Sequence, residues 1–160
     1  MTMDTNDIKA LRLLQDEGRA SWTRLGELLG ITGPAAAERV RRLEERGIIR
    51  GFTTLINPES IGLGLTAFVA LSLEKPSQRD AFLKRVQALP EIQECHHCTG
   101  DDDHLLKVRC SGVTDLDRLI NTELKSLPGV LRTRTTVVMR TSKDSTALPL
   151  PKEGSPRVEG

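Results

Sequence analysis

Apolar residues in the first third of the chain recur every three or four positions, the spacing of helices that bury one face. This pattern predicts a first helix at 5–16. A second helix starts after Ser21, a residue type that caps helix N-termini, and stops at Gly30. A third follows almost at once, with Thr32 as its expected N-cap. Two short helices joined by a tight, glycine-containing turn are typical of a helix-turn-helix.

The third helix has the side chains expected of a helix that inserts into DNA. Its first turns carry small residues, which allow a close approach to base edges, and its later arginines can hold phosphates. A solvated amphipathic helix has a similar composition, so the two preceding helices decide the interpretation. We expect Ala35, Ala36 and Glu38 to face base edges. The candidate DNA-binding residues are Thr32, Pro34, Ala35, Ala36, Glu38, Arg39, Arg41, Arg42 and Arg46.

Strand-forming residues come next, after Gly47, which suits the end of a helix. They are Ile48, Ile49, Phe52, Leu55 and Ile56. This run predicts a β wing. Residues 1–54 are therefore expected to form a winged helix-turn-helix domain.

The pattern changes beyond a linker at 55–64, which contains proline and glycine. The expected elements are, in order, a strand at 65–73, a helix at 78–89, strands at 92–99 and 104–110, a helix at 116–127 capped by Thr114 or Asp115, and a strand at 130–140. The order β-α-β-β-α-β is that of a ferredoxin-like domain, placed at 65–141. The predicted fold class is therefore α+β, a winged helix-turn-helix followed by a ferredoxin-like domain.

Two further expectations concern surfaces and ends. The strands are apolar on both faces, so the sheet face without helices is expected to meet another subunit. The tail at 142–160 has several prolines and few apolar residues, and is expected to be disordered.

Composition narrows the class of protein. The formal net charge is +1, and the first 62 residues hold nine basic and nine acidic side chains, so affinity for DNA must come from local clusters and from oligomerisation. No apolar run approaches the roughly 20 residues of a membrane span, and the N-terminus lacks the apolar core of a signal peptide. We expect a cytoplasmic protein whose three cysteines are thiols.

The sequence resembles the Lrp/AsnC (leucine-responsive and asparagine-responsive) transcription regulators over roughly residues 3–141. The matching segments are Met3–Ile8, Leu29–Thr32, Arg39–Glu44, Gly47–Ile49, Gly100–Val108, Leu127–Val130 and Thr133–Met139. The resemblance implies double-stranded DNA with two-fold related half-sites as a partner. It also implies a homodimer, formed through the ferredoxin-like sheet, that assembles into larger rings.

The resemblance also implies that the second domain senses a small effector, usually an amino acid, at the Gly100–His104 turn. The glycine permits close approach of a ligand carboxylate to backbone amides, and one carboxylate of the turn, Asp103 or Asp101, could take an α-ammonium group. A solvated hairpin turn is the alternative. His104 stands where the family most often has Tyr or Phe, which leaves the effector's identity open. The candidate effector-binding residues are Gly100, Asp101, Asp102, Asp103, His104, Thr133 and Thr135.

A second cluster, Cys95-His96-His97-Cys98, offers four metal-ligand residue types in a row. In a strand, however, these side chains alternate between two faces and do not close a tetrahedral site. We therefore expect no metal, no cofactor and no enzymatic activity. The prediction is a transcription regulator whose oligomeric state or DNA affinity responds to an effector. The alternative is a ligand- or metal-binding sensor whose DNA-binding half has lost its function.

Overall fold

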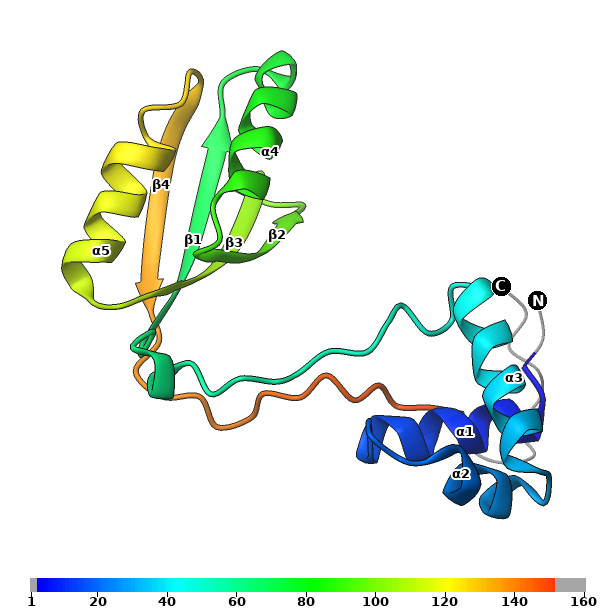
Figure 1. Ribbon diagram of the computed structural model, residues 1–160. Coiled ribbons are helices and arrows are strands. Elements are labelled where there is room, and N and C mark those ends of the chain that lie inside the picture. Colours follow the sequence, from blue (N-terminus) through cyan, green and yellow to red (C-terminus); the bar gives the residue numbers. More distant parts are fainter. Residues whose placement is uncertain (1–2, 152–160) are drawn as a thin grey trace. The chain divides into compact units, whose positions relative to one another are not determined.

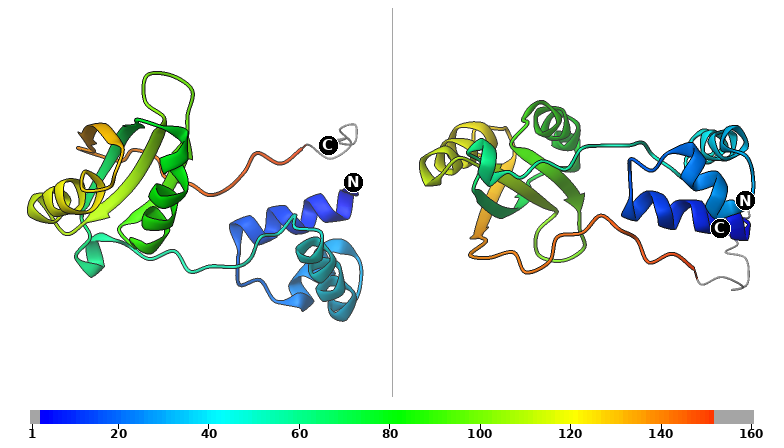
Figure 2. Two further views of the ribbon diagram at one scale, coloured as in Figure 1. Left: turned by 90° about the horizontal axis from the view of Figure 1, so that it is seen from above. Right: turned by 60° about the horizontal axis from the view of Figure 1, so that its bottom comes forward.

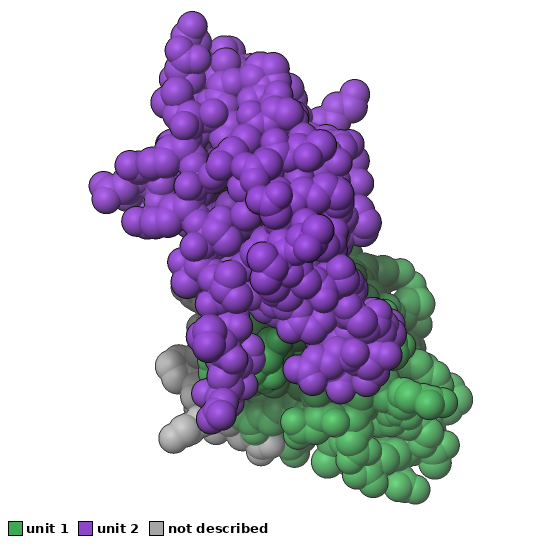
Figure 3. Space-filling view, turned by 90° about the vertical axis from the view of Figure 1, so that its left-hand side faces the viewer, with its two compact units in different colours: residues 1–55, 144–160 green, residues 56–143 purple. Residues whose placement is uncertain are grey.

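The computed structural model describes residues 3–151, which fall into two compact units (Figure 3). One unit holds the residues up to Leu55 together with those from Asp144 onward. The other spans Ile56–Lys143. Each has its own hydrophobic core. No helix in the described part of the chain is both long and apolar enough to cross a membrane.

The first unit contains three helices, α1 (Thr5–Asp16), α2 (Trp22–Leu29) and α3 (Gly33–Glu45) (Figure 1). Each begins at a side chain that accepts a hydrogen bond from a first-turn amide, namely Asp4, Ser21 and Thr32. Gly30 ends α2 in the left-handed conformation, with φ of 68°. The predicted helix-turn-helix and its caps are confirmed.

The turn between α2 and α3 depends on Gly26. A Cβ atom at this position would lie 2.7 Å from the carbonyl oxygen of Ile31, a contact that real Cβ atoms essentially never make. The absence of a side chain therefore lets the turn fold back onto α2. Ala36 and Val40 of α3 then pack against Leu25 in the core.

The β wing predicted after α3 has no strand in this structure, where residues 46–64 are irregular apart from a short helical turn. Directly after α3, the amides of Ile48 and Ile49 both donate to the carbonyl oxygen of Leu43, which continues the helix cap. Ile49 packs against the core of the unit, whereas Leu55 and Ile56 are exposed. A strand needs a neighbour to pair its backbone groups, and among residues 3–151 all strands belong to the sheet of the second unit.

The tail has no helix or strand between residues 142 and 151, yet it contacts α1. The amide of Leu148 donates to Gln15 Oε1 (2.6 Å), and Gln15 Nε2 donates to the Leu148 carbonyl (3.3 Å). Arg12 donates to the carbonyl of Pro151. The sequence predicted a disordered tail at 142–160 and did not predict these contacts. Residues 152–160 of the tail lie outside the described residues.

The second unit is built on a four-stranded antiparallel sheet (Figures 1 and 2). Its strands are β1 (Leu65–Leu73), β2 (Ile92–His97), β3 (His104–Cys110) and β4 (Val130–Val137), in the order β2-β3-β1-β4. The helices are α4 (Arg79–Ala88), preceded by the short η2 (Pro76–Gln78), and α5 (Val113–Arg118), continued by η3 (Leu119–Leu124). This order and pairing confirm the ferredoxin-like fold.

One helix cap differs from the prediction. The fifth helix starts at Val113 after Gly112, one residue before the expected cap Thr114. Asp115 instead turns back and accepts hydrogen bonds from the amide and hydroxyl of Ser111. A further short helix, η1 (Glu59–Ile61), lies in the linker.

The two faces of the sheet differ in character. Alternate residues of β1 and β3, such as Val69 and Leu106, pack against Phe82 of α4 and Leu119 of η3 in one apolar core. The opposite face carries no helix. Register places Phe68, Ala70 and Leu105 there, but also several charged residues. These are Glu94, Lys107, Arg109, Arg132 and Arg134. This face is therefore more polar than the sequence pattern predicted.

Candidate DNA-binding helix and effector cavity

The exposed side of α3 is the candidate DNA-reading surface. Pro34, Ala35, Arg41 and Arg42 are exposed and Glu38 is half-buried. The expectation that Ala36 faces base edges is wrong for this structure, because its side chain is fully buried in the core. Ala36 occupies the face of α3 that packs against α2, opposite the exposed arginines. Its role is to allow close helix packing.

Arg39 and Arg46 are directed toward α1 rather than outward. Arg39 Nη1 lies 2.7 Å from Asp4 Oδ2 and 2.5 Å from Asp7 Oδ1. Arg46 Nη1 lies 3.6 Å from Asp7 Oδ2. Asp7 is only 5% exposed, and a buried carboxylate needs charged or hydrogen-bonding partners. These two arginines therefore tie α3 to α1.

Arg41 and Arg42 remain at the surface with their guanidinium groups paired to acids on the same helix. Arg41 bonds to Glu38 and Glu45, and Arg42 Nε lies 3.1 Å from Glu38 Oε1. The hydrogen bond from Arg41, followed by that from Arg42, lowers the pKa of Glu38 to about 2. Exposed pairs of this kind contribute little to stability, so both guanidinium groups can exchange these partners for phosphates.

The Gly100–His104 turn joins β2 to β3 and is closed by backbone bonds. Gly100 has φ of 130°, a conformation that side-chain-bearing residues rarely adopt. The Asp103 carboxylate accepts a hydrogen bond from the Leu73 amide (2.8 Å), and the Asp103 amide donates one to the Leu71 carbonyl. Asp103 therefore fastens the turn to β1.

Asp102 is held by two arginines of β4. Its carboxylate oxygens lie 3.0 Å from Arg132 Nη2 and 2.7 Å from Arg134 Nη2. Ser72 donates a weaker bond to the same carboxylate. Two cations facing the row of aspartates offset the repulsion between neighbouring carboxylates.

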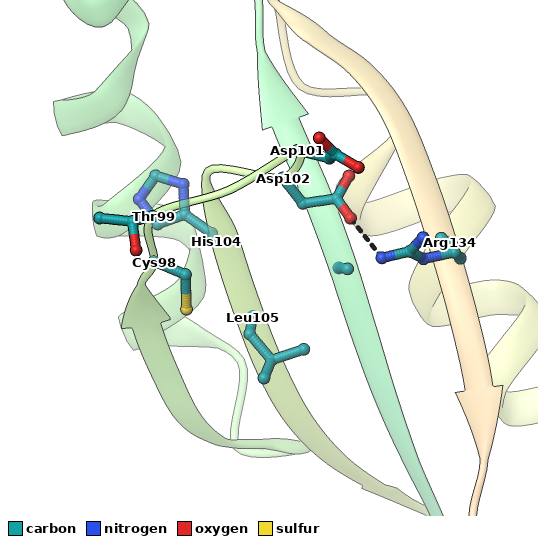
Figure 4. Close-up of a pocket in the computed structure, with 8 residues that line it drawn as sticks. Cys98, Thr99, Asp101, Asp102, His104, Leu105 and Arg134 are labelled. Atoms are coloured by element: carbon teal, nitrogen blue, oxygen red, sulfur yellow. Dashed lines mark hydrogen bonds and ion pairs between the residues drawn. The ribbon is translucent and has the colours of Figure 1, made fainter.

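A cavity of about 230 Å³ lies beside this pair on the helix-free face of the sheet (Figure 4). Its lining comprises Ala70, Cys98, Thr99, Asp101, Asp102, His104, Leu105 and Arg134. Asp101 is exposed, and its carboxylate has no hydrogen-bond or ion-pair partner among residues 3–151. The cavity thus combines a carboxylate available for a cation with the Asp102–Arg134 ion pair, next to the apolar side chains of Ala70 and Leu105.

The structure brings the turn residues together but not the two threonines. Thr133 and Thr135 pair with Leu71 and Val69, whose side chains lie in the helix-covered core, so both threonines project away from the cavity. Arg132 and Arg134 alternate with them and were missed. Strand alternation around the expected threonines would have found these arginines, had the register with β1 been known.

The cysteine-histidine run behaves as an ordinary strand end. Cys95 packs against the core, and the His97 ring contacts the His104 ring across the β2–β3 pair at a tilt of 45°. Cys98 lines the cavity. Within the described residues no group of three or more His, Cys, Asp or Glu side chains is arranged to hold a metal ion.

Comparison with protein families gives two matches that together span most of the chain. Residues 3–50 match a winged helix-turn-helix DNA-binding family. Residues 66–148 match the Lrp/AsnC ligand binding domain. The boundary between the two matches falls in the segment that follows α3.

Similar proteins are leucine-responsive regulatory proteins. Those of Haemophilus influenzae and Escherichia coli are both 41% identical, over 92% and 91% of this chain and 90% of their own lengths. Among solved structures, a Neisseria meningitidis transcriptional regulator in complex with L-Met has a TM-score of 0.88 at 32% identity, covering 92% of this chain and 97% of its own. A feast or famine regulatory protein from M. tuberculosis, complexed with L-methionine, has a TM-score of 0.84 at 34% identity, covering 92% and 99%.

The matches agree with the fold in both units and in their order along the chain. The helix-turn-helix lies in the first unit, and the four-stranded sheet with its helices lies in the second. The chain therefore belongs to the Lrp/AsnC family of DNA-binding transcription regulators.

Proposed function

We propose that this regulator senses a free amino acid at the Asp101–Arg134 cavity and that binding changes its affinity for DNA. The observation that carries the proposal is the lining of the cavity, which places a carboxylate and a guanidinium beside a small apolar surface. An amino acid that leaves water needs both of its charges matched. Asp101 is suited to the α-ammonium group, and Arg134 to the α-carboxylate.

Support also comes from relatives, two of which were crystallised with L-methionine. The pocket of this chain contains no Phe, Trp or Tyr, which favours aliphatic over aromatic side chains of the effector. We propose leucine and methionine as the first candidates to test.

For DNA, we propose that Ala35, Glu38, Arg41 and Arg42 form the contact surface of α3, with Thr32 and Pro34 at its N-terminal end. These residues share one accessible side of the helix. Arg39 and Arg46 act indirectly, by fixing the position of α3 against α1. The protein acts without catalysis, in the compartment that holds the DNA, which we propose is the cytoplasm.

We further propose a dimer formed through the helix-free sheet face, with dimers joined into larger assemblies. Two-fold related recognition helices would then read half-sites about one helical turn of DNA apart, or a multiple of it. Phe68, Ala70 and Leu105 supply the apolar part of this face, and its charged residues allow complementary pairing.

A mobility-shift titration on the DNA upstream of the protein's own gene tests the proposal. Retardation by the full chain, with an apparent affinity altered by leucine or methionine, is the expected result. Retardation that no amino acid alters would remove the sensing role, and no retardation at all would remove the regulatory role at that site.

A further inference from the structure

His104 is a buried histidine whose ring has no polar partner among residues 3–151. It is 2% exposed, and neither ring nitrogen makes a hydrogen bond. The ring lies against Phe82, with centroids 4.8 Å apart, and against His97 at 5.3 Å. A neutral imidazole has one N–H donor and one acceptor, and a buried polar group without a partner is costly. A partner supplied from solution would recover that cost.

A second cavity, of about 300 Å³, opens beside this ring. It lies at the end of the helix-covered side of the sheet, and its lining includes Leu73, Lys75, Arg79, His97, Asp103 and His104. Among these residues only His104 also borders the Asp101–Arg134 cavity. Figure 4 shows the His104 ring set apart from the Asp102–Arg134 pair, toward a neighbouring helix. The two cavities are therefore separate.

The second cavity is cationic. Lys75 and Arg79 contribute two positive charges, and neither side chain is ion-paired within the described part of the chain. Asp103 is the one acidic residue in the lining, and one of its carboxylate oxygens is occupied by the Leu73 amide. The N-terminal end of η2 and α4 adds a partial positive charge at the same place. The cavity is thus suited to an anion.

The protonation state of His104 fits a donor role. Burial, and then the neighbouring His97 and Arg79, lower the pKa of His104, while Asp103 acts to raise it. The ring is therefore neutral near pH 7 and keeps one N–H to donate. An anion placed beside it would favour the protonated ring and raise this pKa.

We propose that this cavity binds the carboxylate or phosphate of a small molecule, with Arg79 and Lys75 matching its charge and the His104 ring donating a hydrogen bond. The volume lies at the lower end of the range of small-molecule sites and fits a ligand the size of an amino acid. This site goes beyond the proposed function, because it is separate from the amino-acid cavity and needs no DNA to be observed.

Histidine-ring NMR of the full-length protein tests the proposal directly. Inorganic phosphate and succinate, a carboxylate without an ammonium group, are titrated separately at constant ionic strength set with sodium chloride, with succinamide as the uncharged control. We expect the His104 ring signals to shift saturably with phosphate or succinate, and the pKa of His104 to rise in the complex. Saturation by succinate alone identifies a carboxylate ligand, and saturation by phosphate identifies a phosphate ligand.

Variants link the signal to the cavity. Calorimetry should show at least tenfold weaker anion binding for Arg79→Ala and for His104→Phe, which keeps an aromatic ring against Phe82. Lys84→Ala, which removes an exposed charge elsewhere on α4, should bind as the wild type does. Equal binding by Arg79→Ala, a response to succinamide as large as that to the anions, or no saturable response would overturn the proposal. None of these outcomes depends on DNA binding, and Arg79 does not line the Asp101–Arg134 cavity, so its variant reports on the second cavity alone.

Discussion

Arg39 and Arg42 lie three residues apart on α3 and have different surroundings. The Arg39 side chain is 28% exposed and bonded to Asp4 and Asp7 of α1, whereas that of Arg42 is 69% exposed. Sequence alone shows two arginines of one amphipathic helix. The separation into a structural and a surface arginine depends on where α1 packs, which residue spacing does not reveal.

Arg39→Ala is expected to destabilise the first unit. It removes the closer cation from the buried carboxylate of Asp7 and leaves Arg46, at the longer distance of 3.6 Å. Losing one partner of a buried pair costs about 3–5 kcal/mol, and the partial exposure of Arg39 places the expected loss at or below the lower end of that range. Urea unfolding of the full chain measures it, with Arg42→Ala as the matched control. Equal stability of the two variants would contradict the assignment.

The same network predicts an acid dependence. Burial acts to raise the pKa of Asp4, but the hydrogen bonds from Arg39 and the Asp7 amide outweigh it and the pKa is lowered. Because the folded pKa is below the unfolded one, this stabilisation is complete above the unfolded value of 3.8 and is lost as the pH falls through the folded value. The free energy of unfolding in urea should therefore fall less between pH 5 and pH 2.5 for Asp4→Asn than for the wild type.

Cys110 illustrates burial acting on a thiol. Its side chain is fully buried in the core, and burial raises its pKa to about 11. The thiolate is the reactive form, so Cys110 should resist iodoacetamide at pH 8 until the second unit unfolds. Mass spectrometry of peptides after brief alkylation, with and without urea, measures this. Modification of Cys110 in the folded protein as fast as that of the half-buried Cys98 would contradict the packing.

At the scale of elements, the helix-turn-helix depends on backbone contact at Gly26. Gly26→Val should destabilise the first unit by at least the roughly 1–3 kcal/mol typical of overpacking, since the added atoms meet the backbone of the turn. Gly18→Ala is the control, because a Cβ there makes an ordinary 3.7 Å contact with the Leu14 carbonyl. Thermal unfolding followed by circular dichroism compares them, and matching midpoints would refute the close approach.

Elements with strong local signals were predictable. The helix caps at Ser21, Gly30 and Thr32, and the bounds of β1 and β3, followed from residue type and periodicity. The absence of a wing strand could not be predicted in this way, since strand-forming residues such as Phe52 form a strand only when a partner is available. The candidate effector turn was predicted from the family motif, but the nearby Arg134 was not, because its approach to Asp102 depends on strand register.

The exposed arginines of α3 predict how strongly the affinity for DNA depends on salt concentration. If Arg42 holds a phosphate, Arg42→Ala should weaken binding to all sequences alike and reduce the salt slope by about one. Lys125→Ala removes an exposed charge in the second unit and serves as the control. Filter binding over a range of salt concentrations measures both slopes. An unchanged slope for Arg42→Ala would remove this residue from the DNA contact surface.

At the scale of the whole molecule, the helix-free sheet face is the proposed dimer surface. Phe68→Lys places a third cation beside Lys107 and Arg109 on this face and should dissociate the dimer. Val113→Lys, at a position that is 73% exposed on α5, should not. Sedimentation at micromolar concentration measures the mass of the assembly that each full-length variant forms. A Phe68→Lys variant with the mass of the wild-type assembly would place the dimer contact elsewhere.

We propose above that a ligand in the sheet-bearing unit controls the DNA affinity of the helix-turn-helix unit. The most direct test is the affinity of the full chain for operator DNA, with and without saturating leucine or methionine, for the wild type and Asp101→Asn. Coupling of 1–3 kcal/mol predicts a five- to 150-fold change for the wild type. Asp101→Asn should keep the basal affinity and lose the response, because its amide no longer matches the α-ammonium charge. An effector response of equal size in both proteins would contradict the account.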